Sequence, residues 1–306
     1  MNKLKTAYFR LHEMLPESLR SRLIELWKRS SVRRSILQRR SEVRKQVKQM
    51  SISRHGTFGP TDLLGILRDN GIQSGDVLFV QCSFNDMHTF QASPLELLKV
   101  LESLVGATGT LLMPAYTNVV SSRERPFRPG FEVTYTGILS ETFRRSAGVL
   151  RSLHPRHSIC GRGPMAASLL EGHERCARAD GVGSPFDKLR LLPNAKILTL
   201  GLPPGHVSFL HWLEDFEPAA LPFVVHRSEP VTSILERIDG SVVEVLDWQL
   251  RTDISARLSL ASVVSQLSSE ACDTFEFKGV AIGIYQVQVL SAELLSLRDR
   301  GIIHYV

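Results

Sequence analysis

Val77-Leu78-Phe79-Val80-Gln81-Cys82 decides the fold, because this continuous apolar run is typical of a sheet strand that is buried on both faces. Two further runs, at residues 109–114 and 195–201, have the same character. Helical patterns precede or separate them at residues 61–69 and 93–104. Strands that alternate with helices predict an α/β fold in which helices flank a mixed central sheet.

The rest of the chain extends this pattern toward its C-terminal end. Further helices are expected at residues 137–145, 164–171, 208–216 and 290–300, and a short strand at 157–161. The texture changes from residue 222, where apolar runs at 223–226 and 242–246 flank the turn signal Asp239-Gly240. These residues predict an antiparallel C-terminal portion with a hairpin.

Composition limits the class of protein. The 306 residues are 43% hydrophobic and 22% charged, which is typical of a globular protein that buries a core. The four cysteines are far apart, so neither a disulfide framework nor a zinc ribbon is expected. No apolar stretch is long enough to span a membrane, and the N-terminus lacks the features of a signal peptide. A cytoplasmic protein without a bound metal is therefore expected.

Positive charge is concentrated at the N-terminal end. Residues 1–54 hold 15 Lys and Arg against 4 Glu, a net charge of +11, and the other 252 residues carry 22 basic against 27 acidic side chains. We expect a basic helical arm at 1–54, with helical spacing already at 15–27, and a separate globular domain at 55–306. The arm could cover the body or a second copy in a homodimer, lie on an anionic membrane surface, or contact RNA. Because the body is mildly acidic, no nucleic-acid partner is expected for it.

One segment after the run at 195–201 suggests catalysis. A helix that begins near Ser208 places His211 and Glu214 three residues apart on one face. Sites in α/β proteins gather where a strand ends and the next helix begins. A histidine there can act as a general base, and a carboxylate one turn away can orient it. The alternative is a half-buried helical histidine and a surface charge, and spacing does not decide between them.

A second segment, Arg151-Ser152-Leu153-His154-Pro155-Arg156-His157-Ser158, gathers two histidines and two serines around a proline. It is either a ligand-contacting loop or a structural turn that Pro155 fixes. No phosphate-binding loop, dinucleotide fingerprint, zinc-protease motif or serine-hydrolase elbow is present. Nucleotide hydrolysis, Rossmann redox chemistry and lipase-type catalysis are therefore disfavoured.

Six segments in register match the motifs of one family. Residues 75–84 resemble G-D-x-[VL]-x-V-H-x-S-[LF], residues 109–117 resemble G-T-L-x-M-P-[TA]-[YF]-T, and residues 151–158 resemble R-S-x-H-P-x-H-S. The others are 137–144, 183–186 (G-S-P-[FY]) and 200–214, which ends in S-x-x-H-x-x-E. Together they resemble the antibiotic N-acetyltransferases, the aminoglycoside 3-N-acetyltransferases and their relatives. The resemblance runs from about Thr61 onward and leaves out the N-terminal arm.

The resemblance implies transfer of an acetyl group from acetyl-CoA to an amine on a sugar or aminocyclitol. It implies that His211 deprotonates the attacking amine and that Glu214 supports it. The residues that it places against the coenzyme, through its motifs, are Ser83, Phe84, Tyr116, Thr117, His154, His157 and Ser158. No metal is implied, and direct transfer is favoured over an acyl-enzyme on Cys82.

Two departures from the family pattern bear on the acceptor. Gln81 replaces a histidine, and the approach to the catalytic helix, residues 201–208, lacks the usual G-x-x-x-N-T-S. No dense run of carboxylates for a polycation is present near the site either. The acceptor is therefore either an aminoglycoside or an amino sugar of polysaccharide or secondary-metabolite synthesis. The rival hypothesis is a catalytically degenerate member that binds a membrane or a partner.

Overall fold

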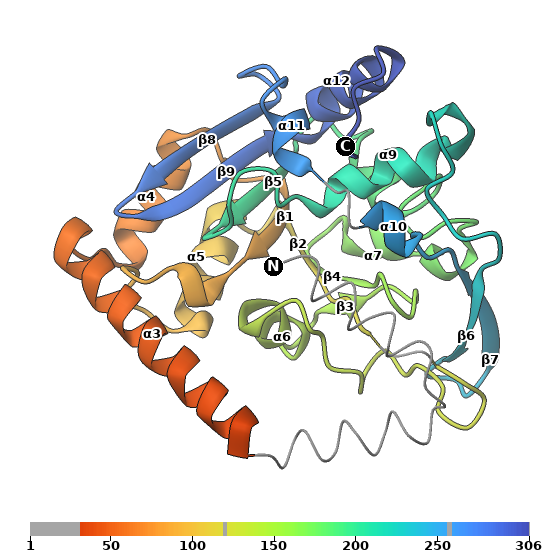
Figure 1. Ribbon diagram of the computed structural model, residues 1–306, viewed down its shortest axis with the longest axis horizontal. Helices are drawn as coiled ribbons and strands as arrows, with labels where there is room; N and C mark the ends of the chain where they lie inside the picture. Colours follow the sequence, from red (N-terminus) through yellow and green to blue (C-terminus); the bar gives the residue numbers. More distant parts are fainter. Residues whose placement is uncertain (1–30, 119–120, 256–258, 306) are drawn as a thin grey trace. The chain divides into compact units, whose positions relative to one another are not determined.

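The computed structural model describes residues 31–118, 121–255 and 259–305 (Figure 1). Contacts divide the chain after Gly56. The described part of the first unit is one helix, α3 (Ser31–His55). The helical pattern expected at 15–27 lies outside the described residues. Across the described ranges, no helix is long and apolar enough to cross a membrane.

The second unit is built on a seven-stranded mixed sheet with the order β3-β4-β2-β1-β5-β9-β8. Its central strand β1 pairs in parallel with β2 and with β5. The pairings of β2 with β4, β3 with β4, β5 with β9 and β8 with β9 are antiparallel. The strands are β1 (Val77–Cys82), β2 (Thr110–Pro114), β3 (Leu150–Arg151), β4 (Ile159–Arg162), β5 (Ala195–Leu200), β8 (Cys272–Phe277) and β9 (Val280–Gln286). The predicted fold class is confirmed.

Helices cover both faces of the sheet, and this explains the apolar run in β1. Leu78 and Val80 pack on one side with helices α4 (Pro60–Asp69), α5 (Pro94–Val105) and α6 (Ile138–Arg144). Val77 and Phe79 belong to the core on the other side, which holds α7 (Ala166–Leu170), α8 (Pro185–Leu189), α9 (His211–Phe216) and α12 (Val287–Asp299) (Figure 1). Successive side chains of a strand point to opposite faces, so a strand with two covered faces is apolar throughout.

Local sequence signals fix the helix starts. Ser93 caps α5: its Oγ accepts from the backbone N–H of Glu96 at 3.2 Å, and its own N–H donates to the Glu96 carboxylate at 2.7 Å. Pro94 occupies the first turn, where its missing N–H costs nothing.

The remaining short elements are η1 (Phe84–Asp86), η2 (His173–Arg175), η3 (Ser208–Leu210), η4 (Pro218–Ala220), α10 (Thr252–Ser255) and α11 (Leu260–Val264).

The C-terminal portion differs from expectation in one segment. A hairpin does turn at Asp239-Gly240, but it pairs β6 (Val231–Glu236) with β7 (Val242–Asp247). The strand predicted at 223–226 is wrong: only an isolated bridge joins His226 to Leu250 there. Two backbone hydrogen bonds, from the Arg251 N–H to the Val225 carbonyl and from the Arg227 N–H to the Gln249 carbonyl, flank this bridge, each at 2.9 Å. Side chains add to them, because Val225 is buried in a small apolar cluster and His226 lies 2.9 Å from Asp215.

The ends of β1 and β5 touch at Gly201, which directly follows β5. Its φ is +66°, a conformation that favours glycine. A Cβ added there lies 2.7 Å from the backbone oxygen of Ser83. The close approach brings the segment after β1 against the loop that leads from β5 to α9.

Candidate active site

The candidate site lies where β1, β2 and β5 end. These strands run parallel, so their carboxyl ends share one edge of the sheet, the usual place for a site in an α/β protein. Gln81 of β1 fixes the start of η3. Its Oε1 accepts from the Ser208 backbone N–H at 2.9 Å, and its Nε2 donates to the Ser208 Oγ at 2.8 Å. The residue that departs from the family pattern thus anchors the short helix that precedes His211.

His211 and Glu214 form a hydrogen-bonded pair at the start of α9. The Nδ1 of His211 lies 2.9 Å from the Glu214 Oε1. The His211 side chain is 31% exposed, whereas that of Glu214 is 2% exposed. The same Glu214 oxygen also accepts hydrogen bonds from the Nε2 of His304 and from the hydroxyl of Tyr305. A partly open imidazole therefore rests on a buried carboxylate that three side chains bind.

The charges around this pair perturb both groups. Burial by itself lowers the pKa of His211, but the charge and hydrogen bond of Glu214, together with the charges of Asp180 and Asp215, raise that pKa to about 9. Burial likewise favours neutral Glu214, yet His211 and His304 hold its pKa well below the ordinary range. The carboxylate is thus ionised, and it raises the proton affinity of the imidazole, so that the neutral ring is a strong base.

A second histidine–carboxylate pair lies in the loop before β4. The Nδ1 of His157 is 3.1 Å from the carboxylate of Asp180, which is buried, and the His157 ring packs 5.5 Å from the ring of Tyr116. Burial lowers the pKa of His157, but the charge and hydrogen bond of Asp180 raise it above its ordinary value. Because Asp180 also raises the pKa of His211, the two pairs belong to one electrostatic environment.

Three of the residues expected to contact the coenzyme lie in the interior. Thr117 donates its hydroxyl to the Pro155 carbonyl at 2.7 Å, and Ser158 donates to the Ala115 carbonyl at 2.8 Å. His154 is fully buried, and its Nδ1 accepts from the His157 backbone N–H at 3.1 Å. All three hold the His157 loop in shape. Their contact with the coenzyme stays a prediction.

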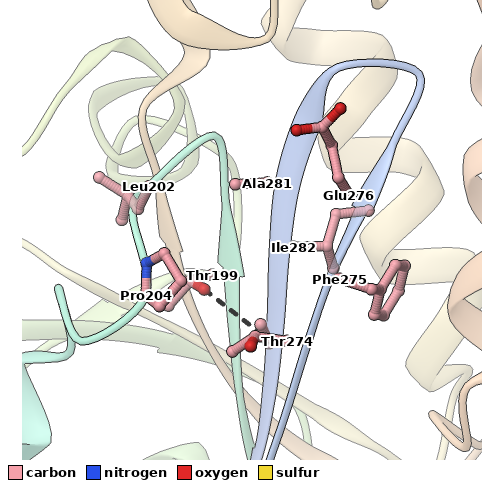
Figure 2. Close-up of a pocket in the computed structure, with 9 residues that line it drawn as sticks. Thr199, Leu202, Pro204, Thr274, Phe275, Glu276, Ala281 and Ile282 are labelled. Atoms are coloured by element: carbon pink, nitrogen blue, oxygen red, sulfur yellow. Dashed lines mark hydrogen bonds between the residues drawn. The ribbon is translucent and has the colours of Figure 1, made fainter. Parts of the chain in front are cut away.

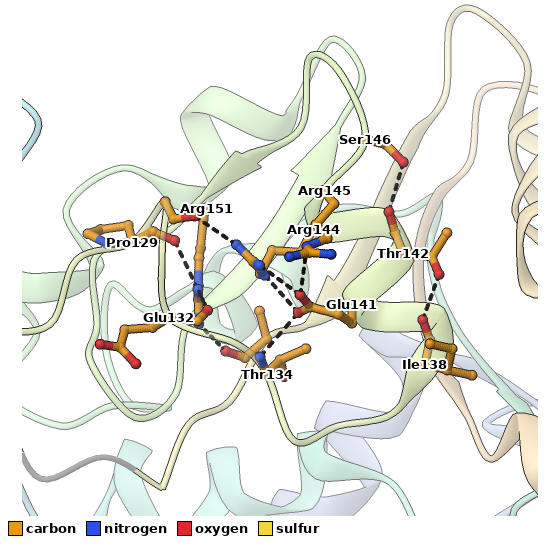
Figure 3. Close-up of polar contacts among 12 residues, drawn as sticks. Pro129, Glu132, Thr134, Ile138, Glu141, Thr142, Arg144, Arg145, Ser146 and Arg151 are labelled. Atoms are coloured by element: carbon orange, nitrogen blue, oxygen red, sulfur yellow. Dashed lines mark hydrogen bonds and ion pairs between the residues drawn. The ribbon is translucent and has the colours of Figure 1, made fainter.

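Arg151 links the same loop to neighbouring segments, because its guanidinium contacts Ser158 in the loop and backbone carbonyls outside it. Its guanidinium donates to the Ser158 Oγ at 2.9 Å and to the Ala115 carbonyl at 2.7 Å. Figure 3 shows it also reaching the backbone of Pro129 and Glu132, beside the ion pair of Arg144 with Glu141. Burial lowers the pKa of Arg151 to about 10. The loop that carries His157 is therefore a rigid part of the site, since a buried cation binds several carbonyls at once.

The end of β1 brings Cys82, Ser83 and Phe84 to the edge of the site, all half-buried. The Ser83 N–H donates to the Leu200 carbonyl at 2.9 Å, so this donor already has an acceptor. The Ser83 hydroxyl bonds Asp86. Burial raises the pKa of the Cys82 thiol far above its ordinary value, and the Asp86 charge adds to the effect. A thiol that resists ionisation is a poor nucleophile.

Only one group among the described residues has the residue types and spacing of a metal site. His211, Glu214 and His304 place one ligand atom each within 4.8 Å of one another. The contact of His211 with Glu214, at 2.9 Å, is a hydrogen-bond distance, and His304 bonds the same oxygen. Hydrogen bonding accounts for these donors and acceptors, so no step is assigned to a metal.

Comparison with known proteins gives the family. The model of the aminoglycoside 3-N-acetyltransferase family matches residues 79–278. The chain belongs to this family. It is 32% identical over 165 residues to aminoglycoside N(3)-acetyltransferase III of Salmonella sp. The matched region covers 48% of this chain and 57% of that protein. It is also 32% identical over 202 residues to aminoglycoside N(3)-acetyltransferase IV of Salmonella sp, and there it covers 72% of the relative.

Solved structures of the family share the fold. Aminoglycoside acetyltransferase AAC(3)-Xa superposes with a TM-score of 0.72 at 20% identity, over 85% of this chain and 99% of that one. AAC-IIIb, in a binary complex with CoASH, superposes with a TM-score of 0.68 at 21% identity, over 82% of this chain and 99% of that one. The seven-stranded mixed sheet is therefore the fold of the aminoglycoside acetyltransferases.

A separate pocket lies beside the loop that leads from β5 toward α9. It is a cavity of about 300 Å³ between the loop that follows β5 and the β8–β9 hairpin. Leu202 and Pro204 lie on the side of the loop, and Thr274 and Ala281 on the side of the hairpin (Figure 2). Its lining is mostly apolar and includes the side chains of Thr199, Thr274 and Glu276. None of the residues predicted to contact the coenzyme lines this pocket.

Four residues at the site escaped sequence reasoning. Asp180 lies in an irregular loop after η2, where no periodic pattern marks it. Gln81 stood out only as a departure from the family motif. His304 and Tyr305 are about 90 positions from Glu214, and only the packing of α12 brings them to it. A buried carboxylate in the first turn of α9 was the available signal, because such a group needs donors from elsewhere.

Proposed function

We propose that the protein is a CoA-dependent N-acyltransferase, which moves the acetyl group of acetyl-CoA to an amino group of an aminoglycoside or an amino sugar. The observation that carries this proposal is the pairing of half-open His211 with buried Glu214 beyond the end of β5. The names of the relatives support N-acetylation of aminoglycosides, and the CoASH complex of AAC-IIIb supports the coenzyme. An intact pair favours an enzyme over a degenerate binding protein.

The reaction needs one base and a site for one developing negative charge. The acceptor amine attacks the thioester carbonyl carbon as a neutral nucleophile, so its proton passes to the Nε2 of His211. The C–N bond forms, the tetrahedral oxyanion collapses, and the C–S bond breaks. The thiolate of CoA leaves and takes up a proton, and His211 returns to its neutral form. The products are an amide and free CoASH.

Transfer is direct in this proposal. An acyl-enzyme on Cys82 requires its thiolate, and burial raises the pKa of that thiol strongly. Its Sγ also lies 3.6 Å from the Met87 Sδ, and the side chain packs against the core on that face of the sheet. We place the coenzyme near Ser83 and Phe84 at the end of β1, and near Tyr116 and His157 across the same sheet edge. Thr117, His154 and Ser158 support that wall from behind.

Release of free thiol tests the proposal. Purified protein is mixed with acetyl-CoA and, in parallel, with a panel of aminoglycosides and a panel of nucleotide-linked amino sugars. Thiol release that depends on an acceptor in either panel supports the function, and the responding panel identifies the acceptor class. A folded protein that binds CoA but releases no thiol with any amine contradicts it and favours the binding protein.

We also propose that α3 makes peripheral contact with an anionic membrane surface. Between residues 31 and 55 the chain carries eight Lys and Arg side chains against one Glu. Val43, Val47 and Met50 are exposed at helical spacing along it. We expect co-sedimentation with vesicles that contain an anionic lipid, and its loss at high salt. Equal sedimentation of the protein without residues 1–54 contradicts this contact.

A homodimer, the other partner expected for the arm, stays a prediction.

A further inference from the structure

We propose that His304 and Tyr305 are positioning residues of the catalytic pair, which fix the Glu214 carboxylate so that it holds His211 in a single tautomer. The geometry stands by itself. The effect on turnover rests on the proposed function.

The first step is the geometry at a single oxygen atom. Glu214 Oε1 accepts from the His211 Nδ1 at 2.9 Å, from the His304 Nε2 and from the Tyr305 hydroxyl. Glu214, His304 and Tyr305 are all buried. A buried carboxylate is costly unless donors replace its lost water, and two residues beyond α12 supply two of these donors. They also restrict a carboxylate that His211 alone would hold by one bond.

The second step concerns the protons. Glu214 is acceptor-only when ionised, so the ring nitrogen that faces it must carry a hydrogen in both histidines. For His211 this places the hydrogen on Nδ1 and leaves the lone pair of the neutral ring on Nε2. His304 donates through Nε2, and its buried Nδ1 has no hydrogen-bond partner among the residues that the structure describes. An unpaired acceptor is the less costly outcome, which agrees with the Nε2–H form of His304.

The third step is what holds the two donors in place. The chain turns after α12 at Gly301, whose φ is +77°, and the Ile302 N–H returns to the Leu297 carbonyl at 2.9 Å. The His304 carbonyl then accepts from the Ser259 N–H at 2.8 Å. The Tyr305 ring packs in a buried cluster with Leu221, Val225, Ile254 and Ile303. The donors are therefore fixed by packing that involves neither His211 nor Glu214.

The consequence reaches the base through Glu214. A fixed acceptor at Nδ1 sets both the orientation of the imidazole and its tautomer, and the wrong tautomer has no lone pair for the incoming proton. His304 and Tyr305 do not touch the reacting atoms in this scheme. They act through Glu214, and the His304 ring also lies edge-on to the His211 ring, with 6.1 Å between the ring centroids.

The kinetic test removes first one donor and then both. Tyr305→Phe deletes one hydroxyl and keeps the ring in its cluster, and we expect kcat to fall about tenfold. His304→Leu with Tyr305→Phe should lower kcat about a hundredfold. The KM values for acetyl-CoA and acceptor should stay within about twofold, because neither residue binds them. When His304→Gln replaces His304→Leu in the double variant, much of the lost kcat should return, because the glutamine amide can replace the Nε2 donor.

A spectroscopic test reports the tautomer without any turnover. Nitrogen-15 NMR of the histidine rings, recorded at a pH above the raised pKa of His211, should show one Nδ1–H form in the unmodified protein. His211→Ala assigns that signal. The double variant should show a mixture of the two tautomers. A protein that proves inactive toward every amine still gives this result, so failure of the proposed function and failure of the positioning role are distinguishable.

A packing control separates positioning from stability. Ile72→Val loosens the buried core on the opposite face of the sheet, which holds neither His304 nor Tyr305, so it should lower Tm by a few degrees and leave kcat and the tautomer unchanged. The positioning role is overturned if folded Tyr305→Phe and the double variant keep full kcat and a single His211 tautomer. It is also overturned if Ile72→Val lowers kcat as much as Tyr305→Phe does.

Discussion

The two histidine–carboxylate pairs at this sheet edge look alike but are held differently. Each ring binds a buried carboxylate through Nδ1, at 2.9 Å for His211 and 3.1 Å for His157, and each side chain is 31% exposed. Glu214 binds two further donors, whereas His157 is the one side chain that bonds the Asp180 carboxylate in the described part of the chain. The exposure of the ring and its pairing with a carboxylate therefore do not distinguish the proposed base, His211, from His157. The number of further donors that bind the carboxylate distinguishes the two pairs.

Replacing the histidine of the more firmly held pair should have the largest effect. His211→Ala removes the base, and we expect kcat to fall about 10³-fold, within the range that general base catalysis supplies. The measurement is acceptor-dependent thiol release at saturating substrate. Circular dichroism and Tm are the controls for folding. If the variant retained wild-type turnover, His211 would have no place in the mechanism.

The carboxylate of the same pair comes next. Glu214→Gln keeps the size of the side chain but removes its charge and offers an amide to three donors, so the His211 ring loses its fixed acceptor. We expect kcat to fall about 10²-fold, with a moderate loss of stability. Asp180→Asn is the matched control in the other pair and should lower kcat by less. Equal losses in the two variants contradict the distinction between the pairs.

The pH dependence of kcat/KM tests the charge state of the base. With the pKa of His211 raised to about 9, most of the base is protonated at neutral pH. We expect kcat/KM to rise by roughly tenfold per pH unit below that pKa and to level off above it. The ion pair with Glu214 contributes stability that is full below the ordinary histidine pKa and is lost as pH rises through about 9.

The acceptor amine loses its own proton over part of this range, so it needs a control. The residual activity of His211→Ala, measured with the same acceptor, isolates the contribution of the amine. A wild-type profile that matches that of His211→Ala at every pH contradicts a titrating base.

The smallest effect is expected at the second pair. His157→Ala removes a ring that packs on Tyr116 but leaves His211 and Glu214 in place. We expect the KM of one substrate to rise by roughly five- to tenfold, the cost of about one lost contact, and kcat to change less. Initial rates over a matrix of both substrates show which KM moves. A fall in kcat as large as that of His211→Ala means that the two pairs share the catalytic work.

The parts of the fold that the sequence predicts are those with a local signal. The strands β1, β2 and β5 are largely apolar runs, and α5 begins with a capping box. Neighbouring residues are therefore enough to predict these strands and this helix. The β8–β9 hairpin is not predicted because its turn is Lys278-Gly279, with φ of 51° and 77°, and its edge strand is half polar. The predicted strand at 223–226 has an apolar run, but an isolated bridge and side-chain packing hold it instead of a ladder.

The same limit applies to the site. His211 and Glu214 are three residues apart, so helical spacing alone is enough to pair them. Residue types in the 151–158 segment indicate polar chemistry but not which groups face outward: His157 does, whereas His154 and Ser158 are interior. His304 and Tyr305 reach Glu214, and Asp180 reaches His157, only through tertiary contacts, which no spacing encodes.

Gly201 limits how this protein can change over evolution. Because any side chain at that position collides with the Ser83 carbonyl, the segment that follows β1 and the loop toward α9 are mechanically joined. A substitution there displaces the end of β1 and the start of the loop toward α9 together, so neither segment can be altered alone.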